Sequence, residues 1–205
     1  MKSKFINLSL NFINHYYPNY EEQEIAYLKY GIEGLYLFIT KISLILVMAI
    51  FLNILYELFL FILSYSLIRL FSFGLHFDSS LECFIASSIS FLGLPYLSMI
   101  ISINSNYKII IGILVLTVFF IYSPADTKKR PIINAKRRFI YKTLSLSVAI
   151  ILLLTSLLTK DNLVSNIILF SLILQSIIIH PLTYKLFKLP YNNYKLYKEV
   201  RLWIY

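Results

Sequence analysis

Long segments that are almost free of charged side chains occupy most of the 205-residue chain. A helix of about 20 apolar residues crosses the hydrocarbon core of a bilayer, so such segments are typical of membrane-spanning helices. Hydrophobic residues make up 59% of the sequence and charged residues 14%, which excludes a soluble domain of this length. We therefore predict an all-α, polytopic membrane protein with about six spans, over residues 34–52, 54–73, 81–103, 108–122, 139–159 and 162–180.

The two ends of the chain differ from these spans. Residues 1–17 carry apolar side chains at roughly helical intervals, which predicts a short amphipathic helix at the membrane surface. Residues 181–205 interleave basic and aromatic side chains, as segments at the membrane interface do, so we expect contact with membrane lipids and not with nucleic acid. One membrane-embedded domain, 1–205, would thus hold an interfacial segment (1–33), a transmembrane bundle (34–180) and a basic, aromatic tail (181–205).

Basic residues cluster in the connection between the fourth and fifth spans and again in the tail. Short cytoplasmic loops are enriched in Lys and Arg, so both segments are predicted to lie in the cytoplasm. With six spans, the N-terminus and the connection before residue 81 then lie on the same side. The predicted location is the cell membrane, with both termini cytoplasmic.

The sequence has a single cysteine, Cys83, which follows a Ser-x-x-Glu pattern that begins at Ser79. This capping box predicts a helix with Ser79 as its N-cap and the thiol in its first turns. The positive end of a helix dipole favours a thiolate over a thiol, although Glu82 opposes this effect in part.

His76 lies seven residues before the cysteine. Along one continuous helix that separation would be about 10 Å, too far for proton transfer. Gly74 and the polar segment Asp78-Ser79-Ser80 suit a bend that would return the imidazole over the helix start. The pattern indicates a Cys–His nucleophile pair, with an inert, packed cysteine as the alternative.

Other polar groups near this pair have less specific roles. Backbone N–H groups at the helix start, or the hydroxyls of Ser79 and Ser80, are candidate oxyanion donors, and Asp78 either orients His76 or only forms the turn. The three histidines, His15, His76 and His180, lack the spacing of metal ligands, so we expect neither a metal site nor a cofactor.

Two short motifs resemble the signatures of the accessory gene regulator B (AgrB) family, which are membrane-embedded cysteine endopeptidases of Gram-positive bacteria. The motifs are Arg69…Gly74-x-His76…Ser80-x-x-Cys83 and Ser123-Pro124-Ala125-Asp126-Thr127-Lys128-Lys129-Arg130-Pro131. The resemblance implies that Cys83 is the nucleophile and His76 the base, with Arg69, Gly74 and Ser80 at accessory positions.

The same resemblance implies a substrate and an outcome. The substrate would be an AgrD-like precursor peptide, cut through a thioester acyl-enzyme and cyclised to a thiolactone or lactone autoinducing peptide for quorum sensing. The family also suggests a homodimer. A non-enzymatic membrane exporter or scaffold subunit, in which Cys83 is merely packed, is the alternative function.

Three consecutive bases, Lys128, Lys129 and Arg130, lie between Pro124 and Pro131. We expect them to bind the precursor beside the thiolate, on the side of the membrane where Cys83 lies. Their alternative role is to set topology and to contact anionic lipid.

Overall fold

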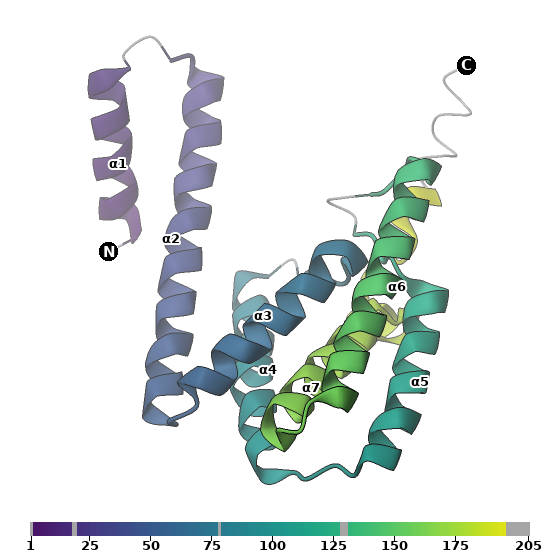
Figure 1. Ribbon diagram of the computed structural model, residues 1–205. Helices are drawn as coiled ribbons and strands as arrows, with labels where there is room; N and C mark the ends of the chain where they lie inside the picture. The colour runs from purple at the N-terminus through teal and green to yellow at the C-terminus, as the bar shows by residue number, and fades with distance from the viewer. Residues whose placement is uncertain (1, 18–19, 78, 128–130, 196–205) are drawn as a thin grey trace, which may run out of the picture. The chain divides into compact units, whose positions relative to one another are not determined.

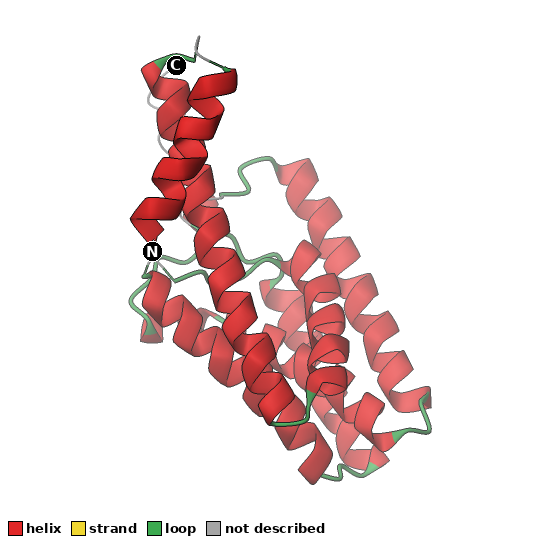
Figure 2. Ribbon diagram, turned by 90° about the vertical axis from the view of Figure 1, so that its left-hand side faces the viewer, coloured by secondary structure: helices red, strands yellow, loops and turns green. Residues whose placement is uncertain are grey.

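A computed structural model describes residues 2–17, 20–77, 79–127 and 131–195. The prediction of an all-α membrane protein is confirmed, because six described helices are long and apolar enough to cross a membrane. They are α2 (Glu22–Phe51), α3 (Leu55–Ser72), α4 (Ser80–Ile100), α5 (Ser105–Tyr122), α6 (Ala135–Leu158) and α7 (Asn162–Ile179), and the shorter helices are α1 (Lys2–Tyr16) and α8 (Pro181–Leu186) (Figure 1). In Figure 2 the described residues form red helices joined by green loops.

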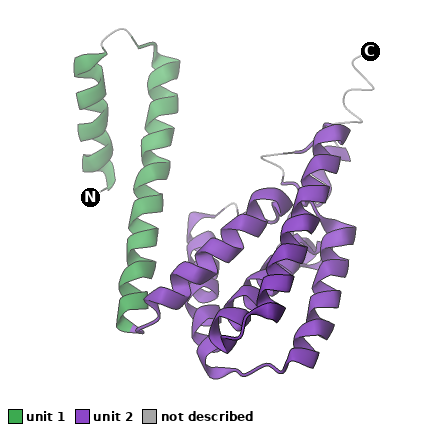
Figure 3. Cartoon of the chain, in the orientation of Figure 1, with its two compact units in different colours: residues 1–51 green, residues 52–205 purple. Residues whose placement is uncertain are grey.

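The chain divides into two compact units, residues 1–51 and 52–205 (Figure 3). In the first, α1 packs on α2 through the rings of Phe5 and Tyr36, whose centroids are 5.4 Å apart, and through an ion pair of 3.7 Å between Lys2 and Glu33. The helix expected over residues 1–17 is thus present as α1. Its location at the membrane surface, and the division of one peptidase domain into three segments, stay predictions.

In the second unit, α7 is the central helix and contacts α3, α4, α5 and α6. More than half of its residues are buried, a larger share than in any of the other five long helices. Its buried side chains include an unusual number of polar ones: Ser165, Asn166, Ser171, Gln175 and Ser176. Small and polar side chains join helices in membranes, where lipid removes the hydrophobic drive for helix association.

Three of these contacts link α7 to different neighbours. The Lys108 ammonium of α5 donates to the Ser165 hydroxyl at 2.7 Å. The Asn166 amide donates to the carbonyl of Ile101, the C-cap of α4, at 2.6 Å. The Gln175 amide donates to the Ser72 hydroxyl of α3, also at 2.6 Å. These three bonds fix the position of α7 along its axis relative to α3, α4 and α5.

Helices α5 and α6 approach closely where α5 has a glycine. A Cβ atom added at Gly112 would lie 2.6 Å from Cδ1 of Leu153, which is closer than two carbon atoms can pack. The contact between these helices therefore depends on the missing side chain.

We expect Gly112→Val to lower the thermal unfolding midpoint of the detergent-solubilised protein by several degrees, since overpacking costs about 1–3 kcal/mol. The control is Gly93→Val in α4, where an added Cβ meets nothing within 4 Å. Equal losses in the two variants would contradict a specific requirement for glycine between α5 and α6.

Candidate active site

Helix α4 begins where the capping box predicts. The Ser79 hydroxyl accepts the Glu82 N–H at 3.5 Å, and the Cys83 N–H donates to the Ser79 carbonyl at 3.1 Å. The prediction of Ser79 as N-cap is confirmed, and Cys83 lies in the first turn with a partly exposed side chain.

His76 is exposed on the segment 73–77 that connects α3 to α4. Its Nδ1 atom lies 2.8 Å from the Phe77 carbonyl oxygen. Because a carbonyl can only accept, Nδ1 must carry the proton, and Nε2 of the neutral imidazole keeps its lone pair. Within the described residues there is no hydrogen bond between His76 and Cys83, so a return of the imidazole over the helix start stays a prediction.

The two sequence motifs meet beside His76. Phe73 and Ala125 form a parallel β-bridge, in which the Gly74 N–H donates to the Ala125 carbonyl at 2.8 Å. The Ala125 N–H donates in turn to the Ser72 carbonyl at 3.0 Å. The connection after α5 therefore holds the segment that carries the proposed base.

Helix α7 holds the same segment from another side. The Gln175 amide donates to the Phe73 carbonyl at 2.6 Å, and the Leu75 N–H donates to the Ile178 carbonyl at 3.3 Å. Sequence reasoning missed Gln175, although a glutamine inside an otherwise apolar span was a visible signal.

The bend expected at Gly74 is present. This residue has φ of +116°, a conformation that side chains disfavour, and an added Cβ would lie 2.7 Å from Cγ2 of Ile178. Both the backbone angle and the close approach of α7 require glycine here.

Arg69 joins the His76 segment to Tyr65, which packs on α4. Its Nη2 atom donates to the Leu75 carbonyl at 3.0 Å, and its Nη1 atom donates to the Tyr65 hydroxyl at 2.6 Å. The Tyr65 ring packs edge-on against Phe91 of α4, with the ring centroids 5.4 Å apart. Sequence reasoning missed Tyr65, which its position four residues before Arg69 on one helix could have indicated.

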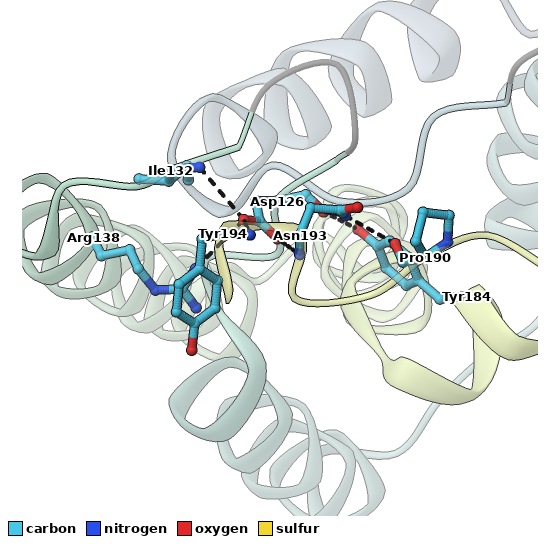
Figure 4. Close-up of polar contacts among 7 residues, drawn as sticks. All are labelled: Asp126, Ile132, Arg138, Tyr184, Pro190, Asn193 and Tyr194. Atoms are coloured by element: carbon cyan, nitrogen blue, oxygen red, sulfur yellow. Dashed lines mark hydrogen bonds and ion pairs between the residues drawn. The ribbon is translucent and has the colours of Figure 1, made fainter. Parts of the chain in front are cut away.

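Asp126 of the second motif is only 1% exposed and lies at the centre of a polar cluster (Figure 4). Its Oδ1 accepts the Asn193 N–H at 3.0 Å, and its Oδ2 accepts the N–H groups of Tyr194 at 2.8 Å and Ile132 at 3.4 Å. The Arg138 guanidinium lies 3.8 Å from Oδ2 and 3.6 Å from the centroid of the Tyr194 ring. These partners compensate the cost of burying a carboxylate.

The same cluster ties the start of the tail to the second motif. The Tyr184 hydroxyl of α8 donates to the Asp126 carbonyl at 3.3 Å. Burial, and secondly the Asp126 charge, raise the pKa of Tyr184, so this hydroxyl keeps its proton. Two hydrogen bonds thus connect the tail to the His76 segment. The Asn193 N–H of the tail donates to the Asp126 carboxylate, and the Gly74 N–H donates to the carbonyl of the adjacent Ala125. Nothing in the periodicity of the tail predicted this contact.

Some of the proposed site residues lie outside the described ranges, namely Asp78, Lys128, Lys129 and Arg130. Their expected roles stay predictions. Ser80 is the first residue of α4 and is exposed. Within the described ranges, no group of three His, Cys, Asp or Glu side chains is arranged to hold a metal ion.

We expect Asp126→Asn to release the tail, because an NH₂ group, which can only donate, replaces one of the carboxylate oxygens that accept backbone N–H groups. Each lost hydrogen bond to a charged group lowers the stability of the folded protein by about 1.5–3 kcal/mol. Amide hydrogen exchange at Asn193 and Tyr194 should accelerate. The control is Asp161→Asn, which changes the N-cap of α7, where Asn serves as well as Asp. Unchanged exchange in Asp126→Asn would contradict the role of this carboxylate.

The AgrB family, accessory gene regulator B, matches residues 5–179 of the chain. A putative AgrB-like protein of Listeria monocytogenes serovar 1/2a is 32% identical over 183 residues, covering 87% of this chain and 89% of that protein. One of Clostridium acetobutylicum is 28% identical over 172 residues, with 83% and 82% covered. The accessory gene regulator protein B of Staphylococcus epidermidis is 33% identical over 168 residues, with 80% and 84% covered. No solved structure matches the chain. This multi-pass membrane protein therefore belongs to the AgrB family, a peptidase family that processes AgrD precursor peptides in quorum sensing.

Proposed function

We propose that this protein is a cysteine endopeptidase that removes the C-terminal segment of an AgrD-like precursor and closes the remaining peptide into a ring. One observation carries the proposal: in a chain that matches the family over residues 5–179, the single cysteine occupies the first turn of α4, and a histidine with an acceptor Nε2 precedes that helix. The partial exposure of Cys83 argues against the alternative of an inert, packed thiol.

The first half of the reaction forms an acyl-enzyme. Nε2 of His76 takes the proton of the Cys83 thiol, and Sγ attacks the carbonyl carbon of the scissile peptide bond. The tetrahedral intermediate collapses to a thioester as the C–N bond breaks, and the imidazolium returns its proton to the leaving amine. Catalytic hydrogen bonds often tighten only when substrate is bound, so we place the close approach of His76 and Cys83 in the substrate complex.

The second half transfers the acyl group within the precursor. A cysteine thiol or a serine hydroxyl of the precursor attacks the thioester carbonyl, its proton passes to His76, and the Cys83 thiolate leaves. The product is a thiolactone or a lactone, and the proton on His76 restores the thiol. No external co-reactant is needed, because the ring-closing bond replaces the thioester.

The helix start supplies groups for the oxyanion. The Ser79 hydroxyl accepts the Glu82 N–H, so its own proton remains available to donate. Together with the positive end of the α4 dipole, it would stabilise the negative oxygen of the tetrahedral intermediate.

The precursor would reach this site from the cytoplasm. The bases between α5 and α6 and those of the tail favour a cytoplasmic location for these segments, for both termini and for the start of α4. A homodimer is part of the proposal, since exposed apolar faces on the long helices suit helix association in a membrane.

Cys83→Ala and His76→Ala should each abolish cleavage of a co-expressed precursor while membrane insertion is unchanged, because each removes a group that acts on the reacting atoms. Mass spectrometry of the precursor and its products measures this. The matched control is His15→Ala, on an exposed position of α1, which should leave cleavage intact. Processing by purified Cys83→Ala protein would overturn the assignment.

Replacing Lys128, Lys129 and Arg130 with Gln should weaken processing and flatten its dependence on ionic strength, because the proposed attraction between these bases and the precursor is screened by salt. The same number of replacements at Lys185, Lys188 and Lys195 should have little effect. Cleavage rates at several salt concentrations compare the two. If both triple variants behave alike, the bases between α5 and α6 are topology determinants only.

A further inference from the structure

A cavity of about 370 Å³ lies between the end of α5, the start of α6 and the tail, next to the Asp126 cluster. Its polar lining includes Tyr122, Arg138, Lys142, Tyr191, Asn192 and Tyr194. We propose that this cavity binds the headgroup phosphate of an anionic phospholipid. The proposal concerns binding alone and does not depend on the peptidase activity proposed above.

The first argument is charge. Arg138 and Lys142 are four residues apart on α6, so their side chains project from the same face of that helix. Asp126, the carboxylate beside the cavity, already accepts three backbone N–H groups. The two cations thus exceed the one anion, and the cavity suits a ligand with negative charge.

The second argument is that Arg138 keeps hydrogen-bond capacity. Its side chain lines the cavity and is 23% exposed, and its ion pair with Asp126, at 3.8 Å between Nη1 and Oδ2, is too long for a hydrogen bond. The exposed part of the guanidinium can therefore donate to a phosphate oxygen in the cavity.

Neutral donors complete the lining. Burial raises the pKa of Tyr191 to about 12, an effect that the nearby Arg138 charge opposes, so the hydroxyl stays protonated in the physiological range. Tyr191 and the Asn192 amide can therefore both donate to phosphate oxygens.

The third argument concerns the surroundings, which favour a lipid over a water-borne anion. Phe120, Ile121 and Phe139 are all more than half exposed on α5 and α6, where they can contact acyl chains. The Lys142 ammonium lies 5.0 Å from the centroid of the Phe120 ring, so a cation and an apolar surface adjoin at this point. The cavity lies where α5 ends and α6 begins, which is the expected depth of the headgroups.

The test is retention of lipid by the full-length protein in native mass spectrometry, with phosphatidylglycerol and phosphatidylcholine of identical acyl chains. Phosphatidylglycerol should be retained more strongly, because the choline ammonium is repelled by Arg138 and Lys142. Lys142→Gln should weaken its retention about fivefold, as expected for one base beside an anionic headgroup. Lys142→Arg should preserve retention, and so should Lys136→Gln, an exposed base on the same helix outside the cavity.

Several results would overturn the proposal. They are equal losses in Lys142→Gln and Lys136→Gln, equal retention of the two lipids, and displacement of the lipid by a few millimolar inorganic phosphate, which would assign the cavity to free phosphate. Binding of a carboxylate-rich peptide that depends on Lys142, while lipid retention does not, would assign the cavity to a peptide instead.

Discussion

Hydrogen bonds from α7 hold together a bundle that apolar packing alone would leave loosely specified. Lipid tails are as apolar as Leu and Ile, so burial against a neighbouring helix gains little over burial in the bilayer. A side-chain amide in the same position must instead face a hydrogen-bond partner on another helix, because an unpaired polar group in hydrocarbon is costly. Gln175 donates to both Ser72 and Phe73, and it therefore links α7 to the last residue of α3 and to the first residue of the His76 segment.

The fold was predictable from the sequence because a bilayer imposes a length on every span. The predicted third span begins at Leu81 and α4 begins at Ser80; the predicted sixth ends at His180 and α7 ends at Ile179. The first span, predicted over residues 34–52, is the second part of a longer helix, Glu22–Phe51. Hydropathy marks the stretch that matches the hydrocarbon core, whereas a helix can continue into more polar sequence beyond it.

The site was predictable only where its signals are local. A capping box and the glycine before His76 lie within a few residues of the groups they position, so Ser79 and Gly74 could be identified from sequence. The bridge between Phe73 and Ala125 and the bonds from α7 join residues that are far apart in the chain. Asp126 shows why such residues are not predictable from the sequence. An acidic residue just before a run of bases is typical of a surface loop, whereas the packing of the tail buries this one.

The bond from Nδ1 of His76 to the Phe77 carbonyl has a consequence for mutagenesis. In many catalytic pairs a third side chain holds the imidazole in the correct tautomer, and replacing that side chain reveals it. Here the peptide backbone holds the tautomer, and a backbone carbonyl survives every side-chain substitution, including those at Phe77. Alanine scanning of the residues around His76 would therefore leave this contact in place, so the method tests a side-chain partner such as Asp78 but not the backbone carbonyl.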